Sequence, residues 1–153
     1  MRTRGFMLDT SALNRIHDSR QCEWSLRGPL FVTEIQVQEI AQTRDFDRRA
    51  SLLEAYRSLR LTVIRPMGRV MVPKFFGFTN YYPRGLTQSE DHPRFLDNTM
   101  LHIAAAMGSK AKKHYPDALI AEIAMNTNLT LVTADRRQAR VGRQFGMHVE
   151  EIL

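Results

Sequence analysis

The chain has 153 residues, a hydrophobic content of 43%, a formal net charge of +6 and a sequence pI of about 10.0. This length predicts a single domain over residues 1–153 with a substantial core. No apolar run approaches the ~20 residues of a membrane span, and the amino terminus lacks the apolar stretch of a signal peptide, so we expect a cytoplasmic protein without a membrane partner. One cysteine excludes an intrachain disulfide.

The first half of the chain alternates short apolar runs with amphipathic segments. The alternation predicts, in chain order, a strand at 5–8, a helix from 11 to about 26, a strand at 30–32, a helix from 33 to about 42, a helix at 45–59 and a strand at 61–64. Thr33 and Gln36 form a capping-box pattern at the start of the second helix. Strands alternating with helices indicate a mainly parallel sheet with helices on both faces.

Residues 66–93 do not fit this alternation. They contain four prolines, three glycines and five aromatic residues without helical or strand periodicity, so we expect an insertion. The aromatic side chains pack a small subdomain or a dimer contact in one interpretation. In the other they stack on unpaired RNA bases.

The second half returns to regular patterns, which predict helices at about 94–107 and 117–127, a strand at 129–133, a helix from about 135 to 144 and a final strand at 147–152. Asp117 opens one of these helices on its apolar face, and Asp135 follows the strand at 129–133. Asp9 follows the first strand, with hydroxyls placed to cap the next helix. Each acid alone fits an ordinary helix start, but three acids at one rim of a sheet would repel one another unless protons or a divalent cation neutralise them.

The basic charge predicts a polyanionic partner, although a merely solvated basic surface is the alternative. Two basic clusters adjoin the acids in the sequence, which makes four of their side chains candidates for nucleic-acid contact: Lys112, Lys113, Arg136 and Arg137. Asp97 and Glu122 lie at the edges of apolar helices, where we expect solvated side chains, with a supporting role at the site as the alternative. The five histidines show no paired ligand spacing, so a zinc site is not expected.

Four stretches of the chain carry a family resemblance: FMLDTSAL (6–13), VTEIQVQEI (32–40), DALIAEIA (117–124) and LTLVTAD (129–135). They resemble the PIN domain family of metal-dependent nucleases, and within it the toxin-type ribonucleases of toxin-antitoxin pairs. The resemblance implies a three-layer α/β/α PIN-like domain with a mainly parallel central sheet. It implies an endoribonuclease that uses Mg²⁺ or Mn²⁺, cleaves RNA, is often a homodimer and is silenced by a small antitoxin protein.

The resemblance assigns the same four acids to catalysis and to metal binding: Asp9, Glu39, Asp117 and Asp135. It matches Thr33 to the hydroxyl that precedes the family's glutamate and Thr133 to the hydroxyl before the last aspartate. Ser11 and Thr133 are expected to support the acids by orienting them or a water. Helical periodicity by itself leaves open whether Glu34 or Glu39 faces the site, and the resemblance favours Glu39.

Two other functions fit parts of the pattern. A PIN-like domain that binds RNA or a protein without cutting is one. An aspartate-based phosphotransfer domain is the other, although Arg65-Pro66 follows the third strand where a receiver domain carries its phosphorylated aspartate, and Asp9-Thr10-Ser11 lacks the D-x-D pattern of the dehalogenase type.

Overall fold

A computed structural model of the chain describes residues 5–19, 26–64, 93–108 and 110–152. The five strands of this part form one parallel sheet in the order β3-β2-β1-β4-β5. Their bounds are Phe6–Leu8 for β1, Leu30–Thr33 for β2, Thr62–Ile64 for β3, Thr130–Thr133 for β4 and Val149–Glu151 for β5. The insertion expected at 66–93 lies outside the described residues, apart from Pro93, which begins a helix.

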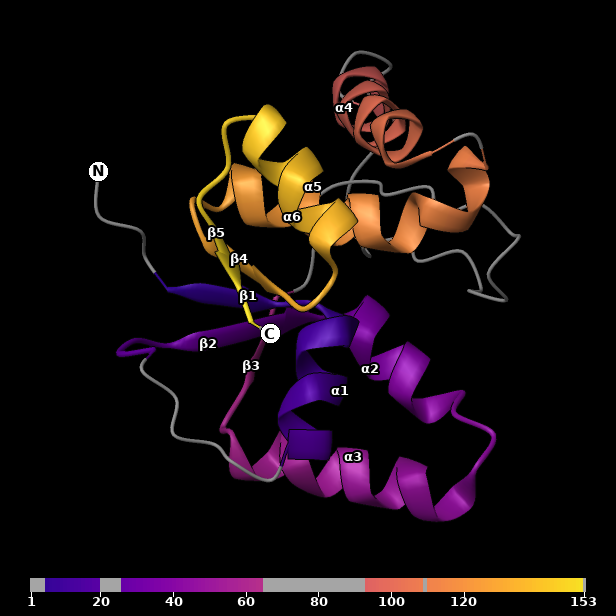
Figure 1. Cartoon of the computed structure of the whole chain (residues 1–153), viewed down its shortest axis with the longest axis vertical. Helices are drawn as coiled ribbons and strands as arrows, with labels where there is room; N and C mark the ends of the chain where they lie inside the picture. The colour runs from indigo at the N-terminus through magenta and orange to yellow at the C-terminus, as the bar shows by residue number, and fades with distance from the viewer. Residues whose placement is uncertain (1–4, 20–25, 65–92, 109, 153) are drawn as a thin grey trace.

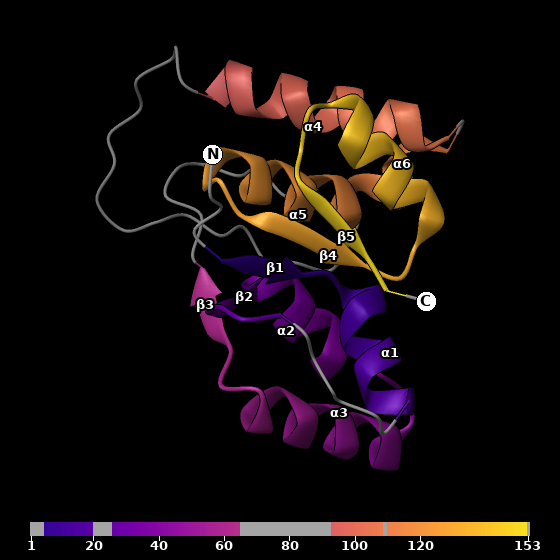
Figure 2. The same ribbon diagram turned by 60° about the vertical axis from the view of Figure 1, so that its left-hand side comes forward.

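Helices cover both faces of the sheet (Figures 1 and 2). One face carries α1 (Thr10–Ser19), α2 (Glu34–Ala41) and α3 (Phe46–Ser58), and the other carries α4 (Pro93–Met107), α5 (Tyr115–Asn126) and α6 (Arg136–Gln144). A 3-10 turn, η2 (Ala111–His114), joins the end of α4 to α5. The predicted three-layer α/β/α architecture with a parallel central sheet is therefore confirmed.

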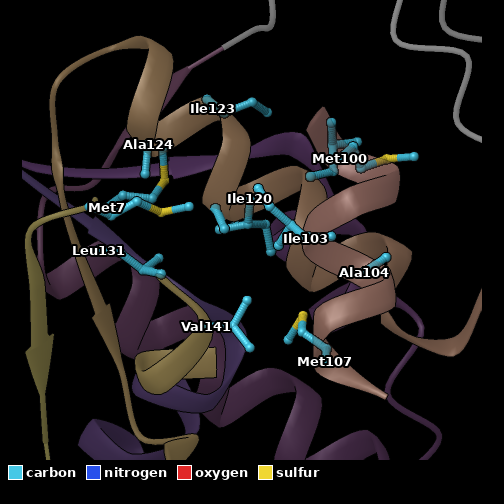
Figure 3. Close-up of a cluster of buried hydrophobic side chains, with 14 of the residues drawn as sticks. Met7, Met100, Ile103, Ala104, Met107, Ile120, Ile123, Ala124, Leu131 and Val141 are labelled. Atoms are coloured by element: carbon cyan, nitrogen blue, oxygen red, sulfur yellow. The ribbon is translucent and has the colours of Figure 1, made fainter. Parts of the chain in front are cut away.

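Alternate side chains of the central strands supply two separate cores. Met7 and Leu131 point into the cluster formed with α4, α5 and α6, which Figure 3 shows in close-up. Leu8 and Val132, one residue further along the same strands, belong to the cluster on the α1 and α3 side. Each of these four side chains is fully buried, because successive residues of a strand point to opposite faces and both faces are covered.

The order of the strands reverses between β1 and β4. From β1 the chain proceeds outward through β2 to β3, and it later returns to place β4 on the other side of β1, followed by β5. In open α/β sheets such a reversal opens a crevice at the carboxyl ends of the two strands, where ligands bind. Leu8 pairs with Val132 at this end, and the amide of Asp9 donates a 3.0 Å hydrogen bond to the carbonyl of Val132.

Most element boundaries agree with the predicted ones to within about two residues. The helix predicted from 11 to about 26 differs, because α1 ends at Ser19 and Leu26 is not helical, while 20–25 lie outside the described residues. None of the described helices combines the length and the apolar character that crossing a bilayer requires.

Candidate metal and active site

Asp9 is buried at the carboxyl end of β1, with 1% of its surface exposed. Its Oδ1 accepts a 2.6 Å hydrogen bond from the amide of Ala12, so Asp9 itself caps α1. The prediction that neighbouring hydroxyls cap this helix is wrong: Thr10 donates instead to Glu39, and the Ser11 hydroxyl contacts both oxygens of Asp9 at 2.8 and 2.9 Å. Burial raises the pKa of Asp9 despite the opposing effect of these hydrogen bonds, and the charge of Asp135 raises it further.

Thr133 connects the end of β4 to the end of β1. Its hydroxyl lies 2.6 Å from Asp9 Oδ2 and donates to it, and it accepts a 3.0 Å hydrogen bond from the amide of Asp135. Ser11 forms a parallel link, because its Oγ lies 3.1 Å from the Thr133 hydroxyl and accepts from the amide of Ala134 at 2.9 Å. The two hydroxyls predicted to support the acids therefore contact Asp9 and fix the two strand ends against each other.

Asp135 is the N-cap of α6. Its Oδ1 accepts from the amides of Arg137 at 2.7 Å and Gln138 at 3.2 Å. The residue is exposed, yet its charge raises the pKa of both Asp9 and Asp117. Asp135 thus serves as an ordinary helix cap and also contributes a carboxylate to the acidic rim.

Asp117 lies in the first turn of α5, directly after Pro116, and His114 is the N-cap residue of this helix. Burial raises its pKa to about 7, and the charges of Glu39, Asp9 and Asp135 add to the effect. The carboxylates that interact here therefore lie near one another although they come from separate parts of the chain. With a pKa of about 7, Asp117 is partly protonated at neutral pH, chiefly because it is buried and to a smaller extent because the neighbouring carboxylates repel its charge.

Glu39, rather than Glu34, faces the cluster from α2. The Thr10 hydroxyl donates to Glu39 Oε2, and burial followed by the charge of Asp9 raises the Glu39 pKa. Thr33, the hydroxyl that the resemblance pairs with Glu39, has a different role. It is fully buried and caps α2, accepting from the amide of Ile35 at 3.2 Å.

Two buried glutamines hold the backbone around the acids. Gln36 completes the predicted capping box and donates a 2.8 Å hydrogen bond from Nε2 to the carbonyl of Leu8, immediately before Asp9. Gln138 donates from Nε2 to the carbonyl of Asp117 at 3.2 Å. The structural role of Gln138 was not predicted, although its position three residues after the cap Asp135 repeats the spacing of a capping box.

Glu122 contradicts its predicted place on the surface. It is 2% exposed, in the stretch of α5 from 118 to 124 in which every residue is buried. The helix lies between α4 and the sheet, so residues on all its sides are covered (Figure 2). The side chain of Asp97, the other acid expected to be solvated, lies outside the described residues.

The four candidate basic residues differ in their surroundings. Lys113 and Arg137 are exposed, and the side chain of Lys112 lies outside the described residues. Arg136 is 83% exposed and its Nε lies 3.9 Å from Glu151, which also pairs with Arg143 at 3.3 Å. An exposed pair at this distance leaves Arg136 able to reorient.

The chemistry of the acidic cluster fits a hard divalent cation. Its donors are carboxylate and hydroxyl oxygens, which Mg²⁺ and Mn²⁺ prefer. Within the described ranges, no group of three His, Cys, Asp or Glu side chains is arranged to hold a metal ion by itself.

Neither a scan of protein-family models nor a search of curated proteins gives a significant match. Two of the solved structures that align with most of this chain are the following. A domain of a functionally unknown protein from Methanocaldococcus jannaschii DSM 2661 has a TM-score of 0.52 at 14% identity, over 97% of this chain and 90% of that one. FitAcB from Neisseria gonorrhoeae has a TM-score of 0.41 at 20% identity, over 94% of this chain and 95% of that one. The first of these similarities supports the α/β fold of the chain.

Proposed function

We propose that the protein is an endoribonuclease that depends on Mg²⁺ or Mn²⁺ and hydrolyses RNA phosphodiester bonds. The observation that carries this proposal is the convergence of carboxylates at the carboxyl edge of the sheet. Asp9 and Asp135 follow the two strands on either side of the topological reversal, and Glu39 and Asp117 join them from helices. The matched PIN-like motifs of the sequence assign these same four acids.

The cation would be held by the carboxylates of Asp9, Glu39, Asp117 and Asp135. A divalent cation in such a site makes a water nucleophilic, polarises the phosphorus and stabilises the leaving oxygen. Ser11 and Thr133 keep Asp9 in one orientation through their hydroxyl donors. Asp117, with its pKa near 7, must release its proton before it can act as a ligand, so we expect cation affinity to increase between pH 6 and about 8.

The proposed substrate is RNA because the chain combines an acidic site with a net charge of +6. The basic side chains would hold phosphates around the cation, and binding should weaken as salt increases. An antitoxin partner and a homodimer are further proposals, which rest on the sequence resemblance alone. A small open reading frame next to the gene would support the antitoxin.

Cleavage of a fluorescently labelled single-stranded RNA tests the proposed function. The unmodified protein should cut with Mg²⁺ or Mn²⁺ and lose activity in EDTA, and Asp9→Asn should be inactive under all conditions. Glu34→Gln is the matched control, because it removes an acid from the same helix as Glu39 whose charge is not among those that raise the pKa of Asp9, Glu39 or Asp117. Full cleavage in EDTA would contradict the metal dependence, and RNA binding without cleavage by the metal-loaded protein would favour the non-catalytic alternative.

A further inference from the structure

Two nitrogen donors meet at Gly108, just beyond the end of α4. Gly108 has a φ of +153°, a conformation that other residues rarely adopt. The position that a Cβ atom would occupy there lies 3.4 Å from His114 Nε2 and 3.6 Å from Arg137 Nη1. The glycine therefore leaves a small space that is lined by an imidazole from η2 and a guanidinium from α6.

Neither donor has a structural partner in the described part of the chain. Arg136 and Arg143 of the same helix both turn toward Glu151, whereas Arg137 forms no ion pair with any described residue. The ring of His114 likewise makes no hydrogen bond there, although this residue is the N-cap of α5. Within the described residues, no contact therefore competes with a ligand for either side chain.

Both residues are close along the chain to acids of the cluster. His114 precedes Asp117 by three residues, and the backbone amide of Arg137 donates to Asp135 at 2.7 Å. RNA that places one phosphate at the acidic cluster must place the next one a few ångströms away, where it needs positive or hydrogen-donating groups. A guanidinium and an imidazole N–H suit phosphate oxygens well.

From these positions we propose that Gly108, His114 and Arg137 form a subsite for the RNA phosphate next to the one that is cut. This inference rests on the proposed nuclease function. It adds His114 and Gly108 to the residues predicted from the sequence to contact RNA, and it gives the Arg137 guanidinium a defined position at Gly108. The absence of a side chain at Gly108 is part of the subsite, because a methyl group there would contact both nitrogens and take up space beside them.

The test is titration of labelled single-stranded RNA in EDTA, where no cleavage occurs if the proposed function is right. Arg137→Gln should weaken binding about tenfold and reduce the slope of log affinity against log salt by about 1, as loss of one phosphate contact does. His114→Gln should also weaken binding, by about threefold. Gly108→Ala should weaken RNA binding without removing a charge. The melting temperature of this variant reports whether the unfavourable φ at residue 108 also destabilises the fold.

Two controls separate a local contact from bulk charge. Arg140→Gln removes the same charge from α6. His148→Gln replaces a histidine just before β5, at the amino ends of the strands, whereas the acids lie at the carboxyl ends. Each should change affinity less than twofold. Equal losses for Arg137→Gln and Arg140→Gln, or no loss for Arg137→Gln, would overturn the subsite while cleavage by the unmodified protein still upheld the nuclease. Absence of both RNA binding and metal-dependent cleavage in the unmodified protein would overturn the nuclease function and the subsite together.

Discussion

The Thr133 hydroxyl donates to Asp9 Oδ2 at 2.6 Å and so joins residues that are 124 positions apart in the chain. The same oxygen accepts from the amide of Asp135 at 3.0 Å. One side chain therefore fixes the acid after β1 and the backbone of the acid after β4. Because both contacts are buried or half-buried, their loss would leave polar groups without their partners.

Thr133→Val should disturb the site while keeping the shape of the strand. We expect Mg²⁺ affinity or cleavage to decrease about 10- to 100-fold, as for other groups that orient metal ligands, and the free energy of unfolding to decrease by about 1 to 3 kcal/mol. Calorimetric metal titration and denaturant unfolding measure the two effects. Thr130→Val, at the other end of β4, is the matched control and should leave metal affinity unchanged. Unchanged metal affinity in Thr133→Val would show that the hydroxyl does not position Asp9.

Asp117 should make the metal-free protein less stable as pH rises. Its folded pKa of about 7 lies above the ordinary value of 3.8, so the folded state binds the proton more tightly than the unfolded state. The resulting stabilisation is fully present below pH 4 and is lost as the pH rises through 7. Allowing for the partial exposure of this side chain, the loss should be about 2 kcal/mol.

Asp117→Asn should remove this dependence on pH. In EDTA at pH 8 the variant should melt above the parent protein, and near pH 4 the two should melt together. The variant should bind Mg²⁺ more weakly at both values. Thermal melts at several pH values decide the question: if Asp117→Asn melts well below the parent at pH 8 without metal, the carboxylate is needed for the structure of α5.

Asp135 combines two roles that two substitutions can separate. Asn is as good an N-cap as Asp, so Asp135→Asn should keep the hydrogen bonds to the amides of Arg137 and Gln138 while removing the charge. We expect it to retain stability and lose metal-dependent cleavage. Asp135→Ala should lose cleavage and also about 1 kcal/mol of stability. Normal cleavage by Asp135→Asn would show that the residue acts only as a cap.

Glu39 and Glu34 provide a comparison within one helix. Glu39→Gln removes a half-buried carboxylate whose pKa is raised by burial and by Asp9, so Mg²⁺ affinity should decrease at least tenfold. The Asp117 pKa should also decrease, because the charge of Glu39 contributes to raising it. Glu34→Gln should change neither quantity. Metal titrations of the two variants measure Mg²⁺ affinity, and NMR of the Asp117 carboxyl measures its pKa. Equal effects of both substitutions would contradict the assignment of Glu39 to the site.

The sequence alone determined the elements and their alternation. Short apolar runs such as Phe6–Leu8 and the pair Leu131 and Val132 are continuous because both faces of the sheet are covered, and this pattern is local. The same patterns located Asp9 and Asp135 after strands and Asp117 at a helix start. The spacing of Thr33 and Gln36 also identified their capping box, because such a box spans only four residues.

Only the tertiary structure decided how these pieces meet. The choice between Glu34 and Glu39 depends on how α2 is rotated against β1, where Thr10 contacts Glu39, and helical periodicity places one acid on each side. Burial of Glu122 depends on the packing of α4 over α5, which the pattern of α5 alone does not contain. The pairing of β1 with β4 brings Thr133 to Asp9, and the meeting of η2 with α6 brings His114 and Arg137 to Gly108. These contacts join residues far apart in the chain, so their geometry is fixed by packing of whole elements rather than by local propensity.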